Sequence, residues 1–112
     1  MPVKITYTTN RPSKYIAFYG EEFWKLDEIV SYMKATYEDT GKLLYTSFED
    51  SEDTLTHTWI EYWDSQESAE QFWADSFLNQ GMVTRSNYRT ENNIVMTHVI
   101  ENIDSSLVPT KL

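Results

Sequence analysis

Residues 54–77, TLTHTWIEYWDSQESAEQFWADSF, contain the change of periodicity that decides the fold. The first ten are rich in β-branched and aromatic side chains, which is typical of a β-strand. Asp64 followed by Glu67 is a variant of the capping box, so a helix is predicted to begin at Asp64 and to end before Gly81. The apolar residues beyond Asp64 have the spacing of one helix face: Ala69, Phe72, Trp73 and Phe77.

The residues before this stretch predict a strand, a helix and a second strand. Val3–Thr8 alternates between apolar and polar residues, which indicates a half-buried strand. A helix is expected from Glu21 to about Thr40, and its stop signal is Gly41. Leu43–Phe48 is the second strand, and the acidic residues 49–53 form the tip of the hairpin that follows it. The helix is expected to bury one face: Phe23, Leu26, Val30, Met33 and Tyr37.

The residues after Gly81 complete the fold. Met82–Asn93 is polar and is either irregular or a short helix, and Ile94–Ile103 is the last strand. The order β-α-β-β-α-β predicts an α+β, ferredoxin-like fold, in which two helices cover one face of a four-stranded antiparallel sheet. Residues 1–103 form this single domain. Residues 104–112 are a tail, or an arm that docks on a partner.

Both faces of the sheet are expected to be covered. In the third strand, Trp59 and Trp63 occupy one face, whereas Ile60 and Tyr62 occupy the other. A sheet with one solvated face shows cleaner polar alternation than this. We therefore predict a homodimer in which a second copy covers the face without helices. The alternative is a monomer with an open, threonine-rich face.

Composition restricts the classes of partner. The 112 residues carry a formal charge of −9, and no Lys or Arg lies between Lys42 and Arg85. A chain without a basic stripe is poorly suited to nucleic acid. It has no cysteine and no apolar stretch of bilayer length, so no membrane association is expected. These features favour a soluble, cytoplasmic protein, and they leave open a non-enzymatic module that docks a basic protein.

Glu61 is the first candidate for chemistry, because it stands between Trp59 and Trp63 on one strand face. A carboxylate among aromatic rings is desolvated, and its pKa rises toward the range useful for proton transfer. The alternative is a solvated glutamate at the rim of the sheet. His57 is the second candidate general base, although a histidine in a strand is equally well explained by packing.

Aromatic side chains could line a pocket for a planar ligand, or could simply form the core. Arg85 and Arg89 could hold an anionic group if their segment is helical, or could lie in a solvated loop. No metal site is expected, because the acidic residues 49–53 lack the pattern of a calcium loop. The candidate pocket residues are Tyr7, Trp59, Trp63, Trp73 and His98, with Tyr45 and Tyr62 as further aromatic candidates.

Residues 59–72 resemble the dimeric α/β-barrel proteins related to antibiotic biosynthesis monooxygenases. In that family an apolar strand with Glu-x-Trp leads into a capped helix, and here Glu61, Trp63, Ser65 and Phe72 occupy those places. The resemblance covers Val3 to about Ile103. It implies a homodimer whose two sheets form a barrel, with a pocket between the sheet and the helices of each protomer.

The resemblance also bears on cofactors and activity. Haem-degrading members are similar to this chain at Asn10 and Trp73, but Met82 and Val83 stand where those members place their axial histidine, so no cofactor is expected. The resemblance implies a small-molecule-binding domain, with or without catalysis. As an enzyme it would be a cofactor-free monooxygenase or isomerase that acts on a planar phenol or ketone. Glu61 or His57 would then move the proton. The alternatives are a protein-interaction module and a structural subunit that exchanges its tail.

Overall fold

The computed structural model describes residues 1–18 and 21–110. Its strands form one antiparallel sheet in the order β2-β3-β1-β4, as expected for a ferredoxin-like fold. The two central strands, β1 and β3, are paired along their whole length, and β4 lies at an edge. The strands are β1 (Val3–Asn10), β2 (Leu43–Asp50), β3 (Thr56–Trp63) and β4 (Val95–Asn102).

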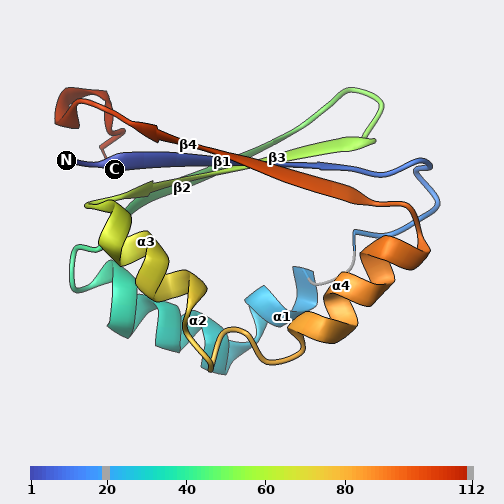
Figure 1. The fold of residues 1–112 in the computed structure, drawn as a ribbon, viewed down its shortest axis with the longest axis horizontal. Helices are drawn as coiled ribbons and strands as arrows, with labels where there is room; N and C mark the ends of the chain where they lie inside the picture. Colours follow the sequence, from blue (N-terminus) through green and yellow to red (C-terminus); the bar gives the residue numbers. More distant parts are fainter. Residues whose placement is uncertain (19–20, 111–112) are drawn as a thin grey trace.

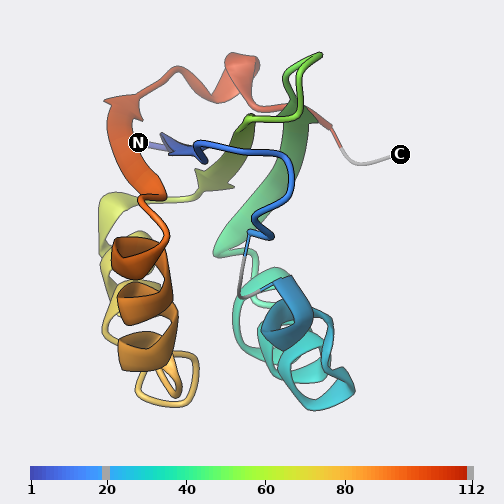
Figure 2. The ribbon, with the colours of Figure 1, turned by 90° about the vertical axis from the view of Figure 1, so that its right-hand side faces the viewer.

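The α-helices lie on one side of the sheet (Figure 1). Figure 2 shows them as two groups beneath the sheet, one containing α1 and α2 and the other α3 and α4. None of the helices in the described ranges is long and apolar enough to cross a membrane. The helices are α1 (Glu21–Lys25), α2 (Asp27–Met33), the π-helix η1 (Lys34–Glu38), α3 (Gln66–Trp73), α4 (Met82–Glu91) and the 3₁₀-helix η2 (Ser105–Leu107).

The first predicted helix is present but interrupted, and its predicted buried face is partly wrong. Leu26 has an extended backbone with ψ 135°, and this residue separates α1 from α2. The break changes the phase of the helix from Asp27 onward. Ile29 is therefore buried, whereas Leu26 and Val30 are about half exposed.

The second predicted helix begins one residue late and ends early. Ser65, not Asp64, is the N-cap, because its hydroxyl accepts a hydrogen bond from the backbone N–H of Ser68. The chain leaves the helix after Trp73, so Phe77 lies in the following turn and Leu78 becomes the buried residue. The segment that could have been irregular, Met82–Asn93, forms α4.

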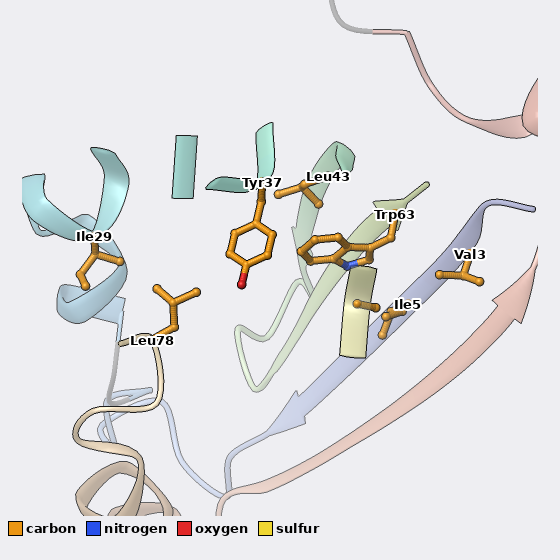
Figure 3. Packing of buried hydrophobic residues seen from close by; sticks show 8 residues of the cluster. Val3, Ile5, Ile29, Tyr37, Leu43, Trp63 and Leu78 are labelled. Atoms are coloured by element: carbon orange, nitrogen blue, oxygen red, sulfur yellow. The ribbon is translucent and has the colours of Figure 1, made fainter. Parts of the chain in front are cut away.

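The core lies at one end of the sheet, where the helices pack closely on β1 and β3 (Figure 3). Trp63 is fully buried, and its ring lies edge-on to Tyr37 and tilted against Phe72. The other end of the sheet extends past this core. The core residues are Val3, Ile5, Ile29, Tyr37, Leu43, Trp63, Ala69 and Leu78.

Candidate functional site

The strand registers arrange the helix-facing side chains in rows across the sheet. Strand alternation places every second residue on this face, and the pairing aligns them between strands. The row next to the core contains Thr46, Glu61, Ile5 and Ile100. The next row outward is almost entirely aromatic and contains Phe48, Trp59, Tyr7 and His98.

Glu61 is buried with three hydrogen-bond donors around its carboxylate. The indole N–H of Trp59 donates to Oε2 and that of Trp63 donates to Oε1, each at 3.1 Å. The Tyr7 hydroxyl is the third hydrogen-bonding partner. Burial raises the pKa of Glu61 above its ordinary value, although all three hydrogen bonds oppose the rise. Within the described ranges, no Lys, Arg or His forms an ion pair with it.

The direction of the Tyr7 hydrogen bond follows from a fourth residue. The Nε1–H of Trp73 donates to the Tyr7 oxygen at 2.8 Å, and an indole N–H can only donate. The Tyr7 hydroxyl is therefore free to donate its single proton in a hydrogen bond to Glu61. Burial and the nearby Glu61 carboxylate raise the pKa of Tyr7, so its proton stays in place at neutral pH. Trp73 thus extends the network from α3 to the sheet.

The aromatic row continues on both sides of Tyr7 and Trp59. The His98 ring lies 5.9 Å from the Tyr7 ring and 5.8 Å from the Trp73 ring, measured between centroids. On the other side, Phe48 stacks on Trp59 with only 14° between the ring planes. Phe48 was not predicted as a site residue, because only the observed register places it beside Trp59.

His57 does not belong to the Glu61 cluster. It is four residues from Glu61 on the same strand face, or about 13 Å along β3. Its Nδ1 lies 2.7 Å from a carboxylate oxygen of Asp50, and its ring is close to Phe18 and Phe48. It therefore belongs to a separate pair near the hairpin tip. His98 is two strands away from it, because β1 lies between β3 and β4.

Three residues that were considered for the site face the other side of the sheet. Tyr62 follows Glu61 in β3, so its side chain is on the opposite face of the sheet. Its ring lies 6.1 Å from that of Tyr45. Asn10 is also on this side and accepts a hydrogen bond from the hydroxyl of Thr56. A pocket role for Tyr45 and Tyr62 is therefore wrong, since the β-sheet itself separates them from Glu61.

A second carboxylate, the partly buried Asp75, ties together the helices that frame the site. One of its oxygens accepts hydrogen bonds from the hydroxyls of Tyr32 and Tyr37, each at 2.6 Å. Burial alone would raise the pKa of Asp75, but these bonds and two backbone N–H donors hold it below its ordinary value. The turn after α3 is thereby tied to α2 and η1, and it positions Trp73 at the end of α3.

A hollow of about 400 Å³ lies beside the aromatic row, between α4 and β4. Met96 on β4 forms one wall, and it is on the same sheet face as His98 two residues later. The hollow is lined by Met82, Val83, Ser86, Asn87, Arg89 and Met96. Within residues 1–18 and 21–110, no three His, Asp or Glu side chains gather as metal ligands.

Comparison with solved structures shows the same fold in other proteins. SnoaB from Streptomyces nogalater, a cofactor-independent oxygenase, matches with a TM-score of 0.61 and 9% identity, over 95% of this chain and 96% of SnoaB. A dimeric ferredoxin-like protein from an uncultured marine organism matches with a TM-score of 0.61 and 12% identity, over 97% and 100% of the two chains.

The predicted resemblance to the monooxygenase-like group is confirmed in fold by these matches. At such low identity the likeness carries the fold alone. No protein-family model matches the chain, and no curated protein is detectably similar in sequence. The chemistry of the site has therefore to be argued from the side chains described above.

Proposed function

We propose that this chain binds a planar phenolic molecule on the aromatic row and that Glu61 takes a proton from it. The observation that supports this is the buried Glu61 carboxylate, which has three hydrogen-bond donors and, among the described residues, no cation paired with it. A buried carboxylate without a paired cation accepts a proton more readily than one in an ion pair. A ligand hydroxyl placed beside Glu61 can supply that proton.

The aromatic residues supply the binding energy and the orientation. Trp59 and Trp73 are partly buried and present ring surface beside Glu61, while His98 is exposed at the edge of the row. Indole rings bind planar ligands through apolar area and stacking. Their N–H groups are already used on Glu61 and Tyr7, so a ligand would meet mainly the apolar faces of these rings.

The reaction proposed is the oxidation of such a phenol by dioxygen without a cofactor. Removal of the proton by Glu61 leaves an electron-rich phenolate, which is the form that gives electrons to dioxygen. The name of SnoaB as a cofactor-independent oxygenase supports this choice of reaction, since it shows that this fold can carry such chemistry in another protein. His57 is not given a role, because it pairs with Asp50 and lies about 13 Å from Glu61 along β3.

Oxygen uptake tests the proposal. With 1,4-dihydroxynaphthalene as the probe, two electrons and two protons pass to dioxygen and the product is 1,4-naphthoquinone. We expect the protein to accelerate this oxidation above the buffer rate, and Glu61→Gln to remove at least about 90% of the acceleration, as is typical for loss of a general base. His57→Gln, on the same strand face, is the matched control and should retain the rate. Equal rates for wild type and Glu61→Gln would overturn the role of Glu61.

We also propose that two copies pair through the sheet face opposite the helices. This face carries Ile60 together with the exposed Val95 and Val99 of β4, and none of the α-helices covers it (Figure 1). The dimeric ferredoxin-like protein from an uncultured marine organism, which has the same fold, supports this arrangement. Pairing would bury apolar edge residues that are exposed in the single chain.

A further inference from the structure

The hollow between α4 and β4 has no part in the chemistry assigned to Glu61. Its walls are largely apolar, because Met82, Val83 and Met96 line it and each is at least 45% exposed. Apolar side chains that surround an open hollow favour an organic ligand over a hydrated ion. The hollow therefore requires an explanation of its own.

Arg89 gives the hollow its charge. It is the one charged residue among the six that line the hollow, and its side chain is only partly exposed. Within residues 1–18 and 21–110, its guanidinium forms no hydrogen bond or ion pair. Arg85, one turn earlier, differs because it donates to the carbonyls of Gln80 and Leu78 and lies over the Phe23 ring at 4.5 Å.

The position of Arg89 is unusual for this chain. The molecule carries a net charge of −9, so its average field repels anions. The guanidinium of Arg89 can attract an anion locally despite this field. Its planar fork of N–H donors matches the two oxygens of a carboxylate. One cation balances one negative charge, which favours a carboxylate over a doubly charged phosphate.

The hollow and the aromatic row are neighbours along β4, because Met96 lines the hollow and His98 belongs to the row. Met96 and His98 lie on the same face of β4, about 7 Å apart by strand geometry. The His98 ring in turn contacts the rings of Tyr7 and Trp73. From strand spacing, the Cα atoms of Met96 and Glu61 are about 16 Å apart, and side chains fill part of that distance.

We propose that Arg89 binds a carboxylate on the ligand whose phenolic proton Glu61 takes. The substrate class is then a planar hydroxy-aromatic acid with its hydroxyl and carboxylate at opposite ends of a fused ring system. This inference rests on the proposed function, because it uses the same aromatic row and the same orientation of the ligand.

The test compares two probes of the same shape. 6-Hydroxy-2-naphthoate carries the carboxylate, and 6-hydroxy-2-naphthamide replaces it with a neutral group. Calorimetric titration of the wild-type protein should show tighter binding of the naphthoate by about tenfold or more, as expected for a charge-assisted contact. Arg89→Gln should abolish this preference and leave the affinity for the naphthamide unchanged.

A matched variant controls for overall charge. Lys34→Gln makes the same charge change at a side chain of η1 that is 64% exposed, on the other helix group, and it should retain the preference. Equal binding of both probes by the wild-type protein, or a preference that persists in Arg89→Gln, would overturn the inference and leave the proposed function standing. Binding of neither probe would overturn both.

Discussion

The Glu61 carboxylate is held by residues two positions away on either side of it. Strand alternation brings Trp59 and Trp63 to the same face, and their indole N–H groups reach opposite oxygens of the carboxylate. Such an arrangement satisfies the lone pairs of a buried anion but does not neutralise its charge. The residue-scale consequence is a carboxyl group that binds a proton more tightly in the folded chain than in the unfolded chain.

This shift makes the stability of the protein depend on pH in a defined direction. Because burial raises the pKa of Glu61 above its ordinary value of 4.5, its favourable contribution is complete below pH 4.5 and is lost as the pH rises through the folded-state pKa. We expect the unfolding free energy of Glu61→Gln, minus that of wild type, to increase as the pH rises from about 4 to 8. Urea denaturation across this range measures the difference.

Glu28→Gln is the control for this measurement. It makes the same chemical change at an exposed residue of α2, away from the proposed interface, so it lacks the burial that makes the Glu61→Gln difference depend on pH. Titration of Asp75 and the other carboxyl groups is common to all three proteins and cancels in the comparison. A difference for Glu61→Gln that decreases with pH would contradict the direction of the shift.

At the scale of elements, the break at Leu26 decides which side chains of the first helical region enter the core. An uninterrupted helix would bury Val30 together with Phe23 and Met33. The extended backbone at Leu26 rotates the segment that follows it, so that Ile29 enters the core instead of Val30, while Tyr37 is buried as predicted. Tyr37 then reaches Asp75, which connects this region to the turn after α3.

The rotated phase predicts opposite outcomes for two adjacent aliphatic residues. Ile29 is 0% exposed, so Ile29→Ala should lower the unfolding free energy by about 2–4 kcal/mol through lost contacts and a residual cavity. Val30 is 51% exposed, so Val30→Ala should change the unfolding free energy by less than about 1 kcal/mol. Denaturant unfolding of the two variants gives both values. Equal losses, or a larger loss at Val30, would mean that the regular helix is the better description.

At the scale of the whole molecule, the sheet has helices on one side and much less cover on the other. All eight residues of β4 are exposed, although this strand pairs with the central strand β1 along its length. The segment after β4, which includes η2, is on the side of the sheet away from the α-helices (Figures 1 and 2). If a second copy packed against this side, apolar side chains that are exposed in the single chain would become buried.

Pairing through this face predicts the mass in solution. Light scattering on a size-exclusion column should give twice 13.2 kDa for the wild-type chain. Val99→Lys puts a charge on the proposed interface and should yield a mass near 13.2 kDa, because burying an unpaired charge is unfavourable. Val30→Lys is the matched control, at a similarly exposed valine on the helix side, and should remain a dimer. A wild-type monomer would contradict the proposed pairing.

The sequence alone determined the order of strands and helices and most members of the site. Periods of two and of 3.6 residues are local properties, so the strands were predicted to within a few residues and Trp59, Glu61 and Trp63 were placed on one face. The same local logic predicted that burial would raise the pKa of Glu61. Tyr7, Trp73 and His98 were named as pocket residues, and the structure brings all three together.

The tertiary structure decided what depends on register, phase and distance. Only the pairing of β2 with β3 places Phe48 on Trp59 and Asp50 beside His57. The phase of the first helical region changed at Leu26, because a backbone break shifts every later side chain around the helix axis. The hollow with Arg89 arises where α4 meets β4, since non-local packing creates a surface that no local pattern encodes.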